Sequence, residues 1–426
     1  MRLSKPSSTD RPLQVWRDLN LSTLTAGFVA MLTGYSSSVV LMVQAGQAAG
    51  LSNAQIASWI WALSIGMAIC TLLLSLRYRL PLVVVWSTPG AALLITSLPG
   101  VSYSDAIGAF IFCGLLLLLS GISSTVARLM RWLPASLAAA LLAGILFRIG
   151  SQILQAAQEQ IGLVLVMFVS YLLAKRWAPR YAVLLALLCG TLIAWVTGML
   201  DLPEVQWQIT LPEWTTPSFS LSAMISIGLP LYIVAMTSQN LPGLAILKSD
   251  GYEVDPAPIL SLTGLMSVLL APFGSHGLNL AAISAAVCTG HEAHPDPAKR
   301  YTAALCCGAL FGAIALFAGT LTVLFMALPQ ALVISIAALA LLGSIASGLA
   351  KAMESQGERE AALIAFMIAA SGFTLFSIGS AFWGLVAGAA TLLLLPGTPR
   401  QILEQPLQNL PQSALDAELA GEQKQQ

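Results

Sequence analysis

The chain has 426 residues, of which 57% are hydrophobic and 9% charged, with 19 basic and 19 acidic side chains. Soluble proteins carry about 25% charged residues, so the composition indicates an integral membrane protein with little mass outside the bilayer. The balanced charge argues against nucleic acid as a partner. The six cysteines all lie in apolar runs, which argues against a disulfide framework.

Apolar runs near the ~20 residues that a helix needs to cross a bilayer predict fourteen membrane spans. The first seven cover residues 21–45, 54–76, 81–97, 105–130, 134–151, 160–174 and 180–199. A polar, proline-rich stretch at 201–217 forms the midpoint. The second seven cover residues 221–245, 258–270, 273–288, 301–328, 331–349, 360–375 and 378–395.

The basic residues test this count independently. With fourteen spans, every Lys and Arg except Arg148 falls on one side of the membrane. Basic residues mark the cytoplasmic side of a membrane protein. The pattern therefore predicts that both termini are cytoplasmic.

The third span is interrupted where its residue types change. Leu82–Trp86 is β-branched and aromatic, which predicts a short strand. Pro89 fits the first turn of a helix, with Ser87 or Thr88 as its cap. Irregular backbone at membrane depth is tolerated only where it is buried in protein or lines a cavity, so this break is a candidate site.

The tenth span is also short and interrupted by glycine. We expect a strand at about Phe273–Leu278 and a helix from about Asn279. Matched breaks in two halves of seven spans are typical of inverted-repeat transporters. The predicted fold is an all-α integral membrane protein with a 7+7 inverted repeat, in which spans 3 and 10 are each a short strand followed by a half-helix.

The two half-helices predict an anion site. Their N-termini would meet near the midplane, where unpaired N–H groups and the helix dipoles attract negative charge without an arginine. In the third span these donors would be Gly90 and Ala91. The alternative is that both segments are kinked helices with a packing role.

Polar and aromatic side chains on other spans fit the same site. Gln239 and Asn240 on span 8 offer donors and acceptors for a ligand or for bonds between helices, and Pro242-Gly243 is expected to break that helix. Tyr35, Trp86 and Phe273 are candidates to stack on an aromatic ring, with core packing as the alternative.

Few ionisable residues lie inside the predicted spans. His276, in the break of span 10, is the candidate to carry a coupled proton or to donate to a substrate, with a structural hydrogen bond as the alternative. Arg148, near the outer end of span 5, is expected to reach the interface or to serve as an outer gate. No Asp or Glu lies in mid-span, which fits an anionic substrate. We predict no metal site and no cofactor, since His291 and His294 lack further ligands nearby.

Five motifs resemble the BenE family of benzoate/proton symporters of bacterial inner membranes. They are Gly34-Tyr35-Ser36-Ser37, Trp86-Ser87-Thr88-Pro89-Gly90-Ala91, Ser238-Gln239-Asn240 with Pro242-Gly243, Glu292-Ala293-His294-Pro295-Asp296, and Ile378-Gly379-Ser380-Ala381-Phe382-Trp383-Gly384. The resemblance implies the fold of uracil permease and the sulfate-type anion transporters, in which a core domain moves against a gate domain, and it implies a homodimer.

On this family plan the domain boundaries follow from the predicted spans. Residues 1–20 would be a cytoplasmic segment, 21–130 and 221–328 the halves of the core, 131–200 and 329–396 the halves of the gate, 201–220 a linker and 397–426 a cytoplasmic tail. Uracil permease-like members hold their substrate with acidic residues on spans 8 and 10. This chain has Gln239/Asn240 and His276/Asn279 in those regions, which suits a carboxylate better than a nucleobase.

We therefore expect proton-coupled uptake of benzoate or a similar aromatic carboxylate across the inner membrane by alternating access. The substrate-binding candidates are Tyr35, Ser38, Trp86, Ser87, Thr88, Gly90, Ala91, Gln239, Asn240, His276, Gly277 and Asn279. The alternatives are a transporter of another small anion or nucleobase and an uncoupled anion channel. A membrane enzyme using Ser275 with His276 is disfavoured, because neighbours on a strand point to opposite faces.

Overall fold

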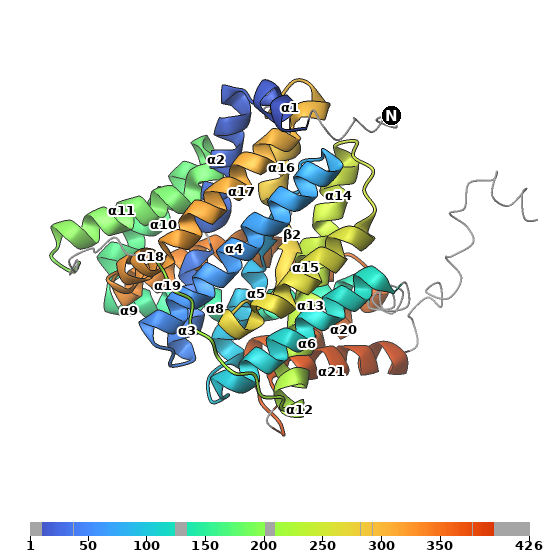
Figure 1. Cartoon of the computed structure of the whole chain (residues 1–426). Helices are drawn as coiled ribbons and strands as arrows, with labels where there is room; N and C mark the ends of the chain where they lie inside the picture. The colour runs from blue at the N-terminus through green and yellow to red at the C-terminus, as the bar shows by residue number, and fades with distance from the viewer. Residues whose placement is uncertain are drawn as a thin grey trace, which may run out of the picture.

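A computed structural model describes residues 11–36, 38–123, 134–200, 209–281, 283–291, 293–376 and 378–395. Within these ranges the chain is mostly helical, and its one two-stranded sheet lies near the centre of the molecule, beside α4 and α15 (Figure 1). The predicted cytoplasmic tail (397–426), residues 1–10 of the predicted N-terminal segment and residues 201–208 of the predicted linker lie outside the described residues.

The helices and strands follow one another in two halves. The first half contains α1 (Arg11–Asp18), α2 (Leu21–Ser36), α3 (Val39–Ala48), α4 (Asn53–Tyr78), β1 (Val84–Trp86), α5 (Thr88–Ser97), α6 (Tyr103–Ile122), α8 (Ala135–Gly150), α9 (Gln152–Glu159), α10 (Ile161–Trp177), η1 (Pro179–Tyr181) and α11 (Ala182–Val196). The second half contains α12 (Leu221–Ala223), η2 (Met224–Gly228), α13 (Leu229–Ala235), η3 (Met236–Asn240), α14 (Leu241–Ser249), α15 (Pro256–Leu270), η4 (Ala271–Phe273), β2 (Leu278–Leu280), α16 (Ile283–Thr289), η5 (Pro297–Lys299), α17 (Tyr301–Leu316), α18 (Ala318–Met326), α19 (Gln330–Ala352), η6 (Gln356–Glu358), α20 (Arg359–Ser371) and α21 (Ser380–Leu394).

In the described part of the chain, six helices are long and apolar enough to cross a membrane. A seventh is present if the bent pair formed by α17 and α18 counts as one span. Several other predicted spans correspond to helices of 10–17 residues, among them α3, α11 and α21. The molecule is thus a mostly helical membrane protein, and the count of fourteen spans stays a prediction.

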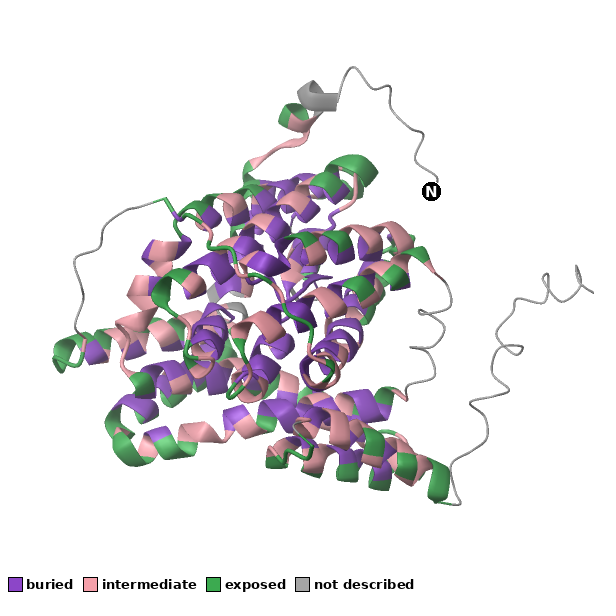
Figure 2. Cartoon of the chain, turned by 60° about the horizontal axis from the view of Figure 1, so that its bottom comes forward, coloured by how far each residue is buried: buried purple, intermediate pink, exposed green. Residues whose placement is uncertain are grey.

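Two groups of helices pack closely within themselves. In the first group α4 lies along α17, α6 along α15, and α2 against α16 and α17. In the second, α8 packs on α19 and α20, α20 on α21, and α10 on α11. Gly144 and Gly384 let backbones approach in the second group, because a Cβ at either position would collide with a carbonyl of α20. Buried residues concentrate between the helices, and exposed ones lie at the periphery (Figure 2).

The predicted spans 21–45 and 301–328 are each two helices in the structure. The first divides into α2 and α3, and the second into α17 and α18, which are bent by 71°. Hydropathy cannot detect such bends, since the residues on both sides are apolar.

The predicted helix break at Pro242-Gly243 is wrong. The chain is helical from Leu221 to Ser249, and a π-helical turn precedes each of its two prolines, Pro230 and Pro242. A proline lacks the N–H group and its ring clashes with the carbonyl four residues earlier. The wider π turn absorbs that clash: the Leu241 N–H donates to Met236 O, five residues back.

The predicted strand at Phe273–Leu278 is also misplaced. Phe273 ends the short 3₁₀ turn η4, and the strand covers Leu278–Leu280. Gly274 and Gly277 adopt φ angles of +109° and +144°, which residues with a side chain rarely adopt. These two glycines let the chain turn before it pairs with β1, and the following helix starts at Ile283 rather than near Asn279.

Candidate functional site

Strands β1 and β2 pair antiparallel and bring the two interrupted segments together. Val85 lies opposite Asn279, and Trp86 lies opposite Leu278. Successive side chains of a strand point to opposite faces, so Val85 and Asn279 share one face of this ribbon. Leu278, on the other face, packs against Gly66 of α4. The Val85–Asn279 face is therefore the one that is free to meet other elements.

The start of α5 is capped by its own chain. Ser87 Oγ accepts a hydrogen bond from the Gly90 N–H at 3.0 Å, and Ser87 O accepts one from the Ala91 N–H at 2.8 Å. The expectation that Gly90 and Ala91 offer free N–H groups to an anion is therefore not met. Gly90 has a packing reason instead, because a Cβ there would lie 2.8 Å from Leu231.

A pair of hydroxyl groups joins α5 to the break between α2 and α3. Ser38 Oγ and Thr88 Oγ1 are 2.6 Å apart. Ser38 is buried, whereas Thr88 is partly exposed. Since each hydroxyl can donate once and accept twice, the pair keeps the capacity to bond a ligand from the exposed Thr88 side.

Two of the three predicted ring contacts lie together. The rings of Tyr35 and Trp86 are 4.8 Å apart, and the Tyr35 hydroxyl bonds Ser64 Oγ at 2.8 Å. Phe273 is not part of this group, since its ring packs on Trp61 and Trp214.

The predicted group of Tyr35, Trp86 and Phe273 therefore does not form, and a ring of α17, Phe311, lies near Tyr35 instead. The Phe311 ring lies 6.4 Å from the ring of Tyr35. Phe311 sits in a uniformly apolar run, so no sequence signal marked it.

Asn240 joins η3 to strand β2. Its Nδ2 donates to Asn279 Oδ1 at 3.0 Å and to Ala235 O at 3.2 Å, while its Oδ1 accepts from the Leu280 N–H at 2.9 Å. These bonds occupy both ends of the amide, so Asn240 has a structural role. Its neighbour Gln239 is partly exposed.

Asn279 is fully buried, yet its Nδ2 has no hydrogen-bond partner within the described part of the chain. An unpaired buried donor costs about 1–3 kcal/mol. Among the described residues, and apart from its two chain neighbours, a Cβ built on Gly277 would meet just one atom within 4 Å, Asn279 Nδ2 at 3.9 Å. The unpaired amide therefore has open space beside it, at Gly277.

Both ring nitrogens of His276 have partners inside the protein. The Trp59 indole N–H donates to Nδ1 at 3.2 Å, and Nε2 lies 3.4 Å from Ser87 O. Since an indole can only donate, Nδ1 is an acceptor and the neutral ring carries its proton on Nε2. The rings of Trp59 and Phe110 pack edge-on against the imidazole. The geometry favours the structural alternative for His276, and it leaves Ser275 without a histidine base.

Arg148 lies away from the ribbon. It is in the last turn of α8, and its guanidinium lies against Gly372, the residue that ends α20. The C-terminus of a helix carries partial negative charge, so this contact is favourable and joins two helices of the second packing group.

The ribbon thus has neutral polar groups on its Asn279 face, and the contact between Trp86 and Tyr35 lies on its other face. Thr88 and Gln239 are partly exposed polar residues near it, and Asn279 Nδ2 is a buried donor with no partner among the described residues. Hydroxyl and amide donors of this kind can hold a carboxylate without a counter-charge.

Comparison with known families and sequences gives three matches of high coverage. The family model "BenE: Benzoate membrane transport protein" matches residues 17–394. The inner membrane protein YdcO of Escherichia coli (strain K12) is 44% identical over 373 residues, which cover 88% of this chain and 95% of that protein. The benzoate membrane transport protein of Acinetobacter baylyi is 38% identical over 379 residues, which cover 89% of this chain and 96% of that protein.

Solved structures share the fold at low sequence identity. The structure of SLC26A9 aligns with a TM-score of 0.62 at 14% identity and covers 90% of this chain and 67% of that one. The transmembrane domain of the cyanobacterial bicarbonate transporter BicA aligns with a TM-score of 0.57 at 16% identity and covers 83% of this chain and 99% of that one.

Proposed function

This chain belongs to the BenE benzoate membrane transport family and has the fold of SLC26-type anion transporters, and on that premise we propose that it takes up benzoate, or a similar aromatic carboxylate, together with a proton. Membership in a transporter family makes the chain a transporter rather than an enzyme.

The unpaired Asn279 amide is the observation that carries the proposed site. In our proposal the substrate carboxylate enters the space beside Gly277 and accepts hydrogen bonds from Asn279 Nδ2 and the Thr88 hydroxyl, with Gln239 as a third donor. The benzene ring extends past Thr88, beyond the end of β1, toward Tyr35 and Trp86. A carboxylate would relieve the cost of the orphaned donor, which favours its binding over that of an apolar solute.

The neutral donor set also bears on how the proton travels. None of the proposed contacts carries a positive charge, and a bare carboxylate is costly to carry through a membrane interior. Both nitrogens of His276 already have partners. We therefore propose that the proton rides on the carboxyl group of the substrate rather than on His276.

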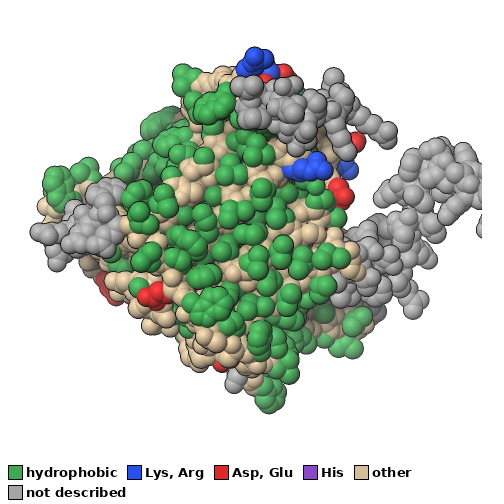
Figure 3. All heavy atoms as spheres, in the orientation of Figure 1, with side chains coloured by type: hydrophobic (Ala, Val, Ile, Leu, Met, Phe, Trp, Pro, Cys, Tyr) green, Lys and Arg blue, Asp and Glu red, His purple; other side chains and the backbone are tan. Residues whose placement is uncertain are grey.

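The proposed architecture is the 7+7 inverted repeat in the inner membrane, with both termini cytoplasmic and with the core and gate boundaries given above. The two packing groups of helices support the core and gate division. The face shown in Figure 3 is largely hydrophobic, and the basic side chains in view lie at the end that carries α1. One-sided basic charge supports cytoplasmic termini. Alternating access would be the movement of one group against the other, and the homodimer remains a family-level proposal.

The test is uptake of labelled benzoate into proteoliposomes, with and without an inward proton gradient. Asn279→Leu, which keeps the volume but removes the donor, should raise KM at least tenfold. The matched control is Gln158→Leu, which makes a similar amide-to-leucine change at an exposed position in the last turn of α9. This variant should behave as wild type. Wild-type uptake that never exceeds equilibrium under the gradient would indicate an uncoupled anion pathway. An unchanged KM in Asn279→Leu would reject the proposed site.

A further inference from the structure

Two neighbouring residues at the start of α17 are buried although both are polar. Arg300 exposes 8% of its surface and Tyr301 none. Each makes several hydrogen bonds, and the two sets of partners come from different halves of the chain. The proposed binding site uses neither residue.

Arg300 bonds the second half. Its Nη1 donates to Thr289 O and its Nε to His294 O, both at 2.7 Å. Thr289 is the last residue of α16, and its hydroxyl donates to the Asp250 carboxylate at the end of α14. The cation therefore lies at the C-terminus of α16, where the helix dipole favours positive charge.

A third Arg300 contact reaches the loop between α14 and α15. Its Nη1 lies 3.5 Å from the Tyr252 hydroxyl. Burial raises the pKa of Tyr252, and the neighbouring guanidinium offsets part of that rise. Arg300 thus holds four segments in one cluster: the end of α14, the loop between α14 and α15, the end of α16, and the loop at His294 that precedes α17.

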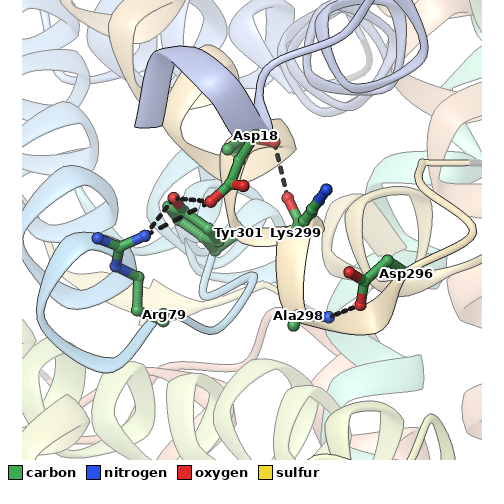
Figure 4. A network of polar contacts seen from close by, with 7 residues as sticks. Asp18, Arg79, Asp296, Ala298, Lys299 and Tyr301 are labelled. Atoms are coloured by element: carbon green, nitrogen blue, oxygen red, sulfur yellow. Dashed lines mark hydrogen bonds and ion pairs between the residues drawn. The ribbon is translucent and has the colours of Figure 1, made fainter. Parts of the chain in front are cut away.

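Tyr301 bonds the first half, as Figure 4 shows. Its hydroxyl donates to Asp18 Oδ2 at 2.8 Å and accepts from Arg79 Nη1, and Asp18 and Arg79 are themselves 3.6 Å apart. Asp18 ends α1, and Arg79 caps α4 with a left-handed φ of +55°. The Arg79 guanidinium also lies over the Tyr301 ring, 4.8 Å from its centre.

We propose that the Arg300–Tyr301 pair is a positioning element that joins the helix before β1 to the helix after β2 and so keeps strands β1 and β2 in register during transport. Arg300 holds α16, which follows β2, and Tyr301 holds the end of α4, which precedes β1. Loosening either end lets Asn279 move relative to Thr88. Arg300 and Tyr301 affect the substrate only by positioning Asn279 and Thr88. The expected change in the benzoate KM therefore rests on the proposed function.

The first readout is local and needs no substrate. Cys288, one residue before Thr289, is fully buried in α16, and Cys113 is fully buried in α6. Wild type and variants are treated with N-ethylmaleimide, and labelling of each cysteine is followed by mass spectrometry. Arg300→Gln should label Cys288 at least fivefold faster and leave Cys113 unchanged. Arg300→Lys keeps the positive charge but not the several N–H donors of the guanidinium, so its Cys288 labelling rate should lie between those of wild type and Arg300→Gln. The exposed control Arg176→Gln should label at the wild-type rate.

The second readout follows Tyr301. Trypsin cleavage after Arg17, at the end of α1, should be at least threefold faster in Tyr301→Phe, because Asp18 loses the hydrogen bond from the Tyr301 hydroxyl and keeps only its ion pair with Arg79. Cleavage after the exposed Arg176 is the internal control. Tyr78→Phe, an exposed tyrosine at the end of α4, should leave both rates at the wild-type value.

The kinetic arm separates positioning from folding. Both Arg300→Gln and Tyr301→Phe should raise the benzoate KM at least fivefold, while a single cooperative unfolding transition shows that the variants remain folded. Equal acceleration at Cys288 and Cys113 would show a global folding role, and local loosening with an unchanged KM would show a local structural role; each result overturns the proposal. If wild type takes up no benzoate, the proposed function fails, whereas the labelling and cleavage results still test the joining of the halves.

Discussion

The amide of Asn240 donates to the amide oxygen of Asn279 across 3.0 Å, and this bond joins the π-helical turn η3 to strand β2. The same Asn240 accepts from the Leu280 N–H. One side chain thus fixes both the position of the strand and the orientation of the Asn279 amide, whose other end is left unpaired.

Asn240→Ala should destabilise the protein. The change leaves Asn279 Oδ1 and the Leu280 N–H buried and unpaired, and each such group costs about 1–3 kcal/mol. We expect a clear fall in Tm in detergent, together with weaker benzoate binding. The adjacent change Gln239→Ala, at a partly exposed position, should leave Tm near wild type while it weakens binding. A Tm for Asn240→Ala equal to that of Gln239→Ala would contradict the structural role of Asn240.

Gly277→Ala should abolish transport while the protein stays folded. The methyl group would occupy the space beside Asn279 Nδ2, and it would also strain a backbone at φ +144°. Gly50→Ala is the matched control, since Gly50 also has a positive φ, of +69°, and open space around it, but lies in the turn after α3. Benzoate affinity and Tm are measured for both variants. Comparable affinity in the two would mean that the space beside Asn279 does not receive the substrate.

Pro242→Ala should restore an ordinary α-helix across η3. The new N–H group can bond Ser238 O, so the extra residue of the π turn is no longer needed. Conversion of the π turn to an α turn rotates Gln239 and Asn240 about the helix axis by about 100° relative to the following turn. We expect lost uptake and a lost Asn240–Asn279 contact. The contact is measured as disulfide formation between Asn240→Cys and Asn279→Cys, with and without Pro242→Ala; equal yields would rule out the rotation.

His276→Gln should retain proton-driven accumulation. The substitution removes a group that titrates near neutral pH in water, but in our proposal the proton travels on the substrate. Because the Trp59 N–H and Ser87 O lose a well-fitted partner, Tm should fall. The measurement is the ratio of internal to external benzoate under an imposed proton gradient. A variant that binds benzoate but no longer concentrates it would identify His276 as the proton carrier.

Sequence alone determined the class of the protein and the location of its interrupted segments. Low charge and long apolar runs required a membrane, and Trp86 to Gly90 required a strand followed by a helix, because these are properties of neighbouring residues. The resemblance to the family, rather than local reasoning, placed Asn279 among the site residues. Local reasoning failed where the signals of neighbouring residues were ambiguous. Pro242 was compatible with a helix break or with a π turn, and Phe273 was compatible with a strand or with the end of a helix.

Tertiary structure decided which polar groups are already paired. The Trp59 indole meets His276 across 217 positions of sequence, and Asn240 meets Asn279 across 39. Such pairs depend on how helices pack and on the register of β1 against β2, which no window of neighbouring residues contains. Packing of this kind gives His276 and Asn240 partners inside the protein and leaves Asn279 Nδ2 without one among the described residues, because a buried side chain can bond only what the rest of the fold brings within reach.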